Sequence, residues 1–313
     1  MKIKMKKQLS VLLLSLVFFI NVVPAQDAND DAPIKVDTLL LTMPLTVNDN
    51  RGRNIPGLKR ENFSIFQSGE EQEIDYFFNE EAPMNVAILI DTSASTKNVL
   101  DKIQKAARDF VKILRPEDKG IIVSFDYQTR FLSGLISDQK KLSNAVNQTR
   151  IADKSGSDMN EAIFQVVKNH FESFKGRKAI IVLTDGMVVK RAFSSQQIMD
   201  VLQKSDTLFY PIVFKSKSLS EAMARSAANN RKPLSIEVLE VLAQETAGKY
   251  YEKDAENLRE AFQNIAQELK NQYLIGFYPQ YAERGISADD IRIQVDQAEL
   301  TVRAKKRWKI KKD

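Results

Sequence analysis

The stretch NVAILIDTSAS, residues 85–95, carries the strongest structural signal in this sequence. Residues 85–90 are almost all apolar, which is typical of a strand buried on both faces of a parallel sheet. The apolar run ends abruptly in Asp91, and Ser93 and Ser95 follow at alternate positions. A buried strand that delivers a carboxylate and two hydroxyls to one point predicts a polar site at its end.

Strands and helices alternate on the C-terminal side of this stretch. We expect helix 97–114 to bury one face, made of Ile103, Ala107, Phe110, Val111 and Leu114. Further expected strands are 120–125, 178–184 and 207–214, an antiparallel edge at 127–135, and helices 158–171, 235–246 and 254–270. The polar stretch 215–233 is expected to be a loop. This alternation predicts an α/β fold with a mostly parallel central sheet and helices on both faces.

The segments on either side of the alternating region are rich in predicted strands. Residues 37–47 are expected to form one strand, and NFSIFQSG and QEIDYFF alternate at period two around a Ser-Gly pair, which predicts a hairpin. After Asn271 the pattern returns to strands. We therefore expect an α/β domain at 83–270 between β-rich segments at 26–82 and 271–313. Because the ends of a domain tend to lie close together, residues 30–82 and 271–313 are expected to pack as one unit.

The first 25 residues predict export. Four lysines precede a 15-residue apolar stretch, Leu9 to Val23, and VPA ends at Ala25. This is the pattern of a secretory signal peptide that is cleaved after Ala25. The alternative is an uncleaved N-terminal anchor, although 15 apolar residues fall short of the roughly 20 that span a bilayer. The mature protein is expected to be periplasmic or secreted, without a transmembrane segment.

The composition excludes several classes of protein. The chain has 313 residues, is 43% hydrophobic and 28% charged, and contains no cysteine, so neither a disulfide nor a lipid-modified cysteine is possible. The net charge of +5 comes from the two ends, which leaves about −5 on residues 26–302 and argues against a nucleic-acid-binding body. Since there is a single histidine, a histidine-based metal cage cannot form.

Two further segments bring oxygen atoms to the same edge of the expected sheet. IIVLTDG ends a second buried strand in Thr184 and Asp185, and SGSDMNEAI places Ser157 just before a helix. Ligands of open α/β sheets bind beyond the carboxyl ends of the strands. A set of oxygen ligands without thiol or imidazole suits Mg²⁺ or Mn²⁺. The expected metal ligands are Asp91, Ser93, Ser95, Ser157 and Asp185.

The motif carries three parts: the D-x-S-x-S of residues 91–95, the hydroxyl of Ser157 and the T-D-G of residues 184–186. Together they resemble the metal-ion-dependent adhesion site of von Willebrand factor type A domains. The flanks, VNDNRGRNIPGLKRENFSIFQSGEEQEI and ELKNQYLIGFYP with LTVRAKKRW, resemble those of secreted bacterial proteins with such a domain. The resemblance implies that three serine hydroxyls bind the metal directly and that two aspartates hold it largely through water. One coordination position then stays open for an acidic side chain of a partner protein.

The chain departs from the family pattern in two adjacent positions. The family most often has threonine where this chain has Ser157, and a small or apolar residue where it has Asp158. Serine lacks the methyl group that stiffens the rotamer. Asp158 is expected to lie beside the metal, where it either binds the cation or repels an acidic ligand.

We expect a non-catalytic module that binds another protein in a divalent-metal-dependent manner, because no general base is apparent near the oxygen cluster. Two other functions stay open: an assembly factor of the cell envelope with a vestigial site, and a metal-dependent hydrolase. D-x-S-x-S alone is also an ordinary helix N-cap. Thr184 either supports a ligand or is simply a hydroxyl at a strand end.

Overall fold

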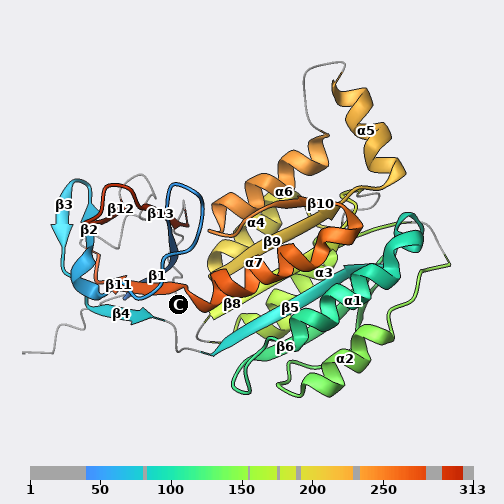
Figure 1. The fold of residues 1–313 in the computed structure, drawn as a ribbon, viewed down its shortest axis with the longest axis horizontal. Coiled ribbons are helices and arrows are strands. Elements are labelled where there is room, and N and C mark those ends of the chain that lie inside the picture. The colour runs from blue at the N-terminus through green and yellow to red at the C-terminus, as the bar shows by residue number, and fades with distance from the viewer. Residues whose placement is uncertain are drawn as a thin grey trace, which may run out of the picture. The chain divides into compact units, whose positions relative to one another are not determined.

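The computed structural model describes residues 40–79, 83–153, 156–174, 177–187, 192–227, 233–279 and 291–305. The expected signal peptide, residues 26–39 and residues 306–313 lie outside these residues. No helix within the described residues is long and apolar enough to cross a membrane. The described chain forms a six-stranded sheet with helices on both sides, and two smaller sheets (Figure 1).

The central sheet has the strand order β10-β9-β8-β5-β6-β7. Its strands are β5 (Met84–Asp91), β6 (Lys119–Phe125), β7 (Thr129–Phe131), β8 (Arg177–Thr184), β9 (Thr207–Phe214) and β10 (Tyr251–Lys253). All neighbours are parallel except β6 and β7, so the expected antiparallel edge is confirmed. β5 lies between β6 and β8 and is buried at every position. The apolar run thus forms a central strand whose carboxyl end carries Asp91.

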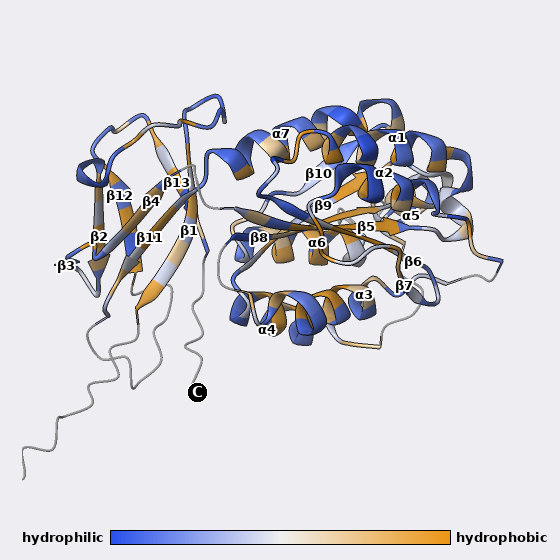
Figure 2. Ribbon diagram, turned by 90° about the horizontal axis from the view of Figure 1, so that it is seen from below, coloured by the Kyte–Doolittle hydropathy of each residue, from blue (hydrophilic) through white to orange (hydrophobic). Residues whose placement is uncertain are grey.

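Helices cover both faces of this sheet. One face packs against α1 (Leu100–Val111), α2 (Gln139–Asn147) and α7 (Leu258–Lys270), and the other against α3 (Met159–Val166), α4 (Ser195–Lys204) and α6 (Leu234–Glu245). Alternate residues of β5 divide between the two cores: Val86 and Ile88 enter one, Ala87 and Leu89 the other. Figure 2 shows the apolar faces of these helices turned towards the sheet. The expected α/β fold class is confirmed.

Short helical turns extend several of these helices. η2 (Ala94–Val99) leads from β5 into α1, η3 (Val167–Phe171) continues α3 as a π-helix, and η4 (Ala255–Asn257) precedes α7. The expected loop at 215–233 is wrong in part, because α5 (Lys217–Ala227) is a helix. Only Leu219 of α5 is a buried apolar residue of the core, so the apolar signal for a helix is weak.

The β-rich segments form two smaller sheets, of order β13-β1-β11-β4 and β12-β2-β3. Their strands are β1 (Leu41–Asn48), β2 (Phe63–Gln67), β3 (Glu70–Gln72), β4 (Tyr76–Asn79), β11 (Tyr273–Phe277), β12 (Ile291–Val295) and β13 (Thr301–Ala304), and η1 (Arg60–Asn62) precedes β2. Among the strands of the described residues, β1 pairs with β11 and β13, which both belong to the C-terminal segment. N-terminal and C-terminal strands therefore share both sheets and one apolar core. The domain boundaries at 82 and 270 remain a proposal.

The expected hairpin at 62–78 is only half correct. β2 and β3 pair around Ser68 and Gly69, whose φ values of 52° and 90° are both positive, as a tight hairpin turn requires. The next strand, β4, leaves this sheet and pairs with β11 in the other. The period-two alternation predicted the strands, but it holds no information on which sheet each one joins.

Candidate metal centre

Asp91 is the centre of a hydrogen-bonded group at the carboxyl edge of the central sheet. Its side chain is completely buried. Oδ1 accepts a hydrogen bond from the backbone N–H of Ser93 at 2.9 Å. Oδ2 accepts from the Thr184 hydroxyl at 2.7 Å and from the Ser157 hydroxyl at 3.4 Å. One carboxylate therefore joins the ends of β5 and β8 and the segment before α3.

The two serines of the first loop lie beside each other. The hydroxyl oxygens of Ser93 and Ser95 are 3.1 Å apart. Ser93 is 7% exposed, whereas Ser95 is exposed. Thr96 fixes this loop because its hydroxyl donates to the backbone carbonyls of Asp91 and Ser93, at 3.1 and 2.8 Å. The loop therefore presents two neighbouring hydroxyl groups, one on the nearly buried Ser93 and one on the exposed Ser95.

Asp185 supplies an unpaired carboxylate oxygen. Its side chain is completely buried, and Oδ1 accepts from the backbone N–H of Met187 at 3.1 Å. Oδ2 is buried without a hydrogen-bond partner among the residues that the structure describes. A buried carboxylate oxygen without a partner is costly, and a bound cation removes that cost. This atom is the most direct indication that the residues fit a metal ion.

Thr184 has two roles in this arrangement. Its hydroxyl donates to Asp91 and accepts from the backbone N–H of Gly186 at 3.0 Å. Gly186 has φ of +76°, a conformation that glycine adopts without strain, and a side chain there would approach Ile236 of α6 to 2.6 Å. Thr184 thus orients the Asp91 carboxylate, and Gly186 allows a turn of the backbone that passes close to α6.

In the structure Asp158 caps a helix, which argues against a place beside the metal. Its Oδ1 accepts from the backbone N–H of Glu161 at 3.1 Å, which makes it the N-cap of α3, and Oδ2 accepts from the N–H of Ala192 at 2.8 Å. Both oxygens are therefore occupied away from Asp91. The helix-cap alternative for D-x-S-x-S is not supported, because Ser93 makes no side-chain capping hydrogen bond to η2 and Asp91 accepts from the loop and from a neighbouring strand instead.

Burial affects the charge of Asp91, which lies near Asp185. The pKa of Asp91 is raised to about 6 in total: burial is the largest cause, hydrogen bonds from Ser93 and Thr184 lower the pKa, and the nearby charge of Asp185 raises it. Two buried carboxylates at one point favour protonation of one of them unless a cation is present. A divalent cation would balance both charges and hold both groups ionised.

The donor set suits a small hard cation. No three histidine, cysteine, aspartate or glutamate side chains within the described residues converge on one point. The group instead combines two carboxylates with the hydroxyls of three serines. Neutral hydroxyls with few carboxylates leave a divalent cation able to accept one more anionic ligand.

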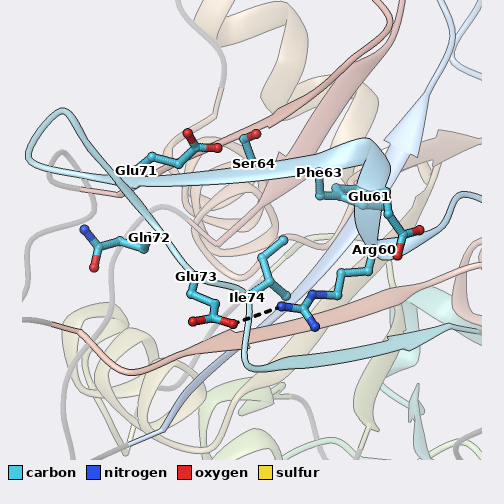
Figure 3. A pocket seen from close by; sticks show the side chains of 8 residues that line it. All are labelled: Arg60, Glu61, Phe63, Ser64, Glu71, Gln72, Glu73 and Ile74. Atoms are coloured by element: carbon cyan, nitrogen blue, oxygen red, sulfur yellow. Dashed lines mark hydrogen bonds and ion pairs between the residues drawn. The ribbon is translucent and has the colours of Figure 1, made fainter.

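A cavity elsewhere in the described residues offers little chemistry. It has a volume of about 380 Å³ and is lined by residues of η1, β2, β3 and the turn after β3. Figure 3 shows that Arg60 faces Glu73, at 3.5 Å, while Glu71 and Gln72 point away from this pair. Both members of the pair are largely exposed, so their interaction is weak and selects no ligand.

Sequence reasoning missed Thr92, Thr96 and Asp126, which hold the first loop in place. Asp126 follows β6 directly, and Asp91 is the last residue of the neighbouring strand β5. Because the two strands are parallel, with Asp91 paired with Phe125, both aspartates reach the same edge. A polar residue after each of two adjacent strands was therefore a usable signal.

Comparison with known proteins agrees with this fold. Residues 86–187 match the von Willebrand factor type A domain model. No curated protein matches in sequence. Proximal thread matrix protein 1 from the mussel byssus has a similar structure, with 14% identity and a TM-score of 0.51 over 65% of this chain and 49% of that one. This chain thus spans about half the length of the mussel protein.

Two other solved structures are similar to this one. A second structure of the mussel protein, described as having a zinc-occupied MIDAS motif, gives a TM-score of 0.51 at 14% identity over 64% of this chain and 48% of that one. BatB from Bacteroides thetaiotaomicron gives a TM-score of 0.47 at 18% identity over 60% of this chain and 97% of that one. With the matched residues 86–187, the strand order and the helices on both faces, the chain contains a von Willebrand factor type A domain.

Proposed function

We propose that Asp91, Ser93, Ser95, Ser157 and Asp185 bind a divalent cation, Mg²⁺ or Mn²⁺, and that the protein uses it to bind another protein without catalysis. The buried, unpaired Oδ2 of Asp185 carries this proposal, because a cation is the partner that such an atom lacks. The mussel protein of the same fold, described with zinc in its MIDAS motif, supports a divalent cation at this edge.

Charge balance supports a binding role. Two carboxylates neutralise a divalent cation, and the remaining donors are uncharged hydroxyls. An acidic side chain of a partner protein can then complete the coordination. The export signal expected at residues 1–25 supports a periplasmic or secreted location for this interaction.

An assembly role without metal is the second candidate. Both oxygens of Asp91 already accept hydrogen bonds within the protein, so Asp91 needs no cation to satisfy them. In that case one of the two aspartates holds a proton and the site is vestigial. The two candidates differ in whether the protein binds metal at all.

Titration calorimetry of the protein with Mg²⁺, Mn²⁺ and Zn²⁺ at pH 8 tests the proposal. We expect saturable binding of one ion, which Asp185→Asn weakens because it removes one of the two charges. Capture of partner proteins from an envelope extract, with Mg²⁺ or with EDTA, then tests the binding role. A wild-type protein that binds no ion in the millimolar range contradicts the proposal and supports the assembly role.

A further inference from the structure

Asp126 is a third buried carboxylate at the carboxyl edge of the central sheet, and the oxygen cluster does not use it. Its side chain is completely buried directly after β6. Oδ1 accepts from the backbone N–H of Gln128 at 3.1 Å. Oδ2 accepts from Arg130 Nη1 at 2.5 Å and from the Thr92 hydroxyl at 2.9 Å. Since both oxygens are occupied, Asp126 serves as a support and not as a metal ligand.

The Thr92 contact reaches the first ligand loop. Thr92 lies between Asp91 and Ser93 and is completely buried. Its N–H donates to the carbonyl of Phe125 at 2.8 Å, and its own carbonyl accepts from the N–H of Ala152 at 2.9 Å. The hydrogen bond from the Thr92 hydroxyl to Asp126 is therefore a further contact that holds Thr92 in place. Thr92 is the residue between the proposed ligands Asp91 and Ser93.

The backbone of the same residue reaches the second ligand loop. The carbonyl of Asp126 accepts from the N–H of Asp158 at 2.8 Å, directly after Ser157. On the other side of Ser157, Gly156 has φ of +137°, and a side chain there would approach Cβ of Tyr127 to 3.2 Å. Both neighbours of Ser157 thus lie against residues 126 and 127.

We propose that Asp126, paired with Arg130, is a positioning residue that sets the spacing between Ser157 and the Asp91–Ser93 loop. The inference rests on the proposed metal site. Arg130 balances the charge of Asp126, so that a third carboxylate adds no uncompensated charge behind the two ligand carboxylates. Groups that orient metal ligands in this way typically change metal affinity by about 10–100-fold when they are replaced.

The test uses Thr92 because its hydroxyl can be removed without a change of shape. We expect Thr92→Val to weaken Mn²⁺ binding by about tenfold in titration calorimetry, and Asp126→Asn to weaken it further. Thr92→Ser keeps the hydroxyl and is expected to stay within about threefold of wild type. Each titration is made at a temperature at which circular dichroism shows that variant to be folded.

Asp118→Asn is the matched control. Asp118 is also a completely buried aspartate bonded to an arginine and to a backbone N–H, but it precedes β6 at the opposite end of that strand. Asp118→Asn is expected to lower the melting temperature and to leave the Mn²⁺ affinity within about twofold of the wild-type value.

The outcomes separate the two hypotheses. If the wild-type protein binds Mn²⁺ but Thr92→Val and Asp126→Asn bind it equally well, or no more weakly than Asp118→Asn, the positioning role is wrong and the metal site stands. If the wild-type protein binds no Mn²⁺, the metal site is wrong and this inference falls with it.

Discussion

The hydroxyl of Thr184 lies 2.7 Å from Oδ2 of Asp91 and links the ends of β8 and β5, which are 93 residues apart in the sequence. This contact connects Asp91, the first residue of the proposed metal site in the sequence, to the segment that contains Asp185, the last. Since Asp91 is completely buried, its carboxylate does not face open solvent. The behaviour of the site therefore depends on how a buried charge is balanced.

Metal is expected to stabilise the folded protein. At a hundredfold excess of cation over its dissociation constant, the gain in free energy of unfolding is about 2.7 kcal/mol. Asp91→Asn removes a ligand charge but keeps the shape of the side chain, so it is expected to lose this gain while the protein remains folded in chelator. Thermal melts of both proteins with Mg²⁺, Mn²⁺ or EDTA provide the measurement. Equal gains in the two proteins would show that Asp91 is not a ligand.

Removing one hydroxyl is expected to weaken metal binding without loss of the fold. Ser157→Ala deletes a nearly buried hydroxyl, and a bond to a charged group is worth about 1.5 kcal/mol or more, which corresponds to roughly a tenfold loss of affinity. Calorimetric titration with Mn²⁺ measures this effect. Ser194→Ala, at the N-cap of α4, is a control that is expected to leave the affinity unchanged.

Asp158 is expected to affect stability and not metal affinity. As the N-cap of α3 with a second bond to Ala192, it stabilises the fold by about 1 kcal/mol, which Asp158→Ala removes. Asp158→Ser keeps a capping oxygen and is expected to recover part of the loss. Chemical denaturation reports stability, and a metal titration reports affinity. A large change in affinity with unchanged stability would place Asp158 in the site after all.

The contribution of Asp118 to stability is expected to disappear in acid. Burial alone raises the pKa of Asp118, but hydrogen bonds from Arg115 and from the N–H of Met84 outweigh it, so the net shift is downwards. A lowered pKa in the folded state stabilises the protein above the unfolded pKa of about 3.9, and this gain is lost as the pH falls through the folded value. Asp118→Asn is therefore expected to be less stable than wild type above about pH 5, with the difference shrinking below about pH 4. Urea denaturation across this range tests the trend; a constant difference contradicts it.

Deletion of residues 271–313 tests the proposed division of the chain. It removes β11 and β13, the two neighbours of β1, and also the only paired neighbour of β4 within the described residues. Amide hydrogens of β1 are expected to lose their protection from exchange, while those of β5 and β8 keep theirs. Unchanged protection in β1 would show that residues 41–79 fold without the C-terminal segment.

The sequence predicted the central sheet well because its strands are continuous apolar runs. The meeting of Asp91, Ser157 and Thr184 at one edge of the sheet was also predictable, since strand ends of a parallel sheet meet there. The direction of a side chain was not visible: Asp158 adjoins Ser157 in sequence, yet its carboxylate turns to α3 and Ala192. The choice of sheet for β4 depends on β11, about 200 residues away, which no local pattern reveals. α5 was missed because its polar sequence resembles a loop.

The pairing of β1 has a consequence for biosynthesis. Leu41 faces Phe277 in the sheet, so the first described strand to leave the ribosome waits for nearly the whole chain before its partners exist. Its alternating apolar side chains are exposed in the meantime, and such unpaired edges invite association with other chains. A holding chaperone is therefore most useful in the interval before residue 277 has been synthesised.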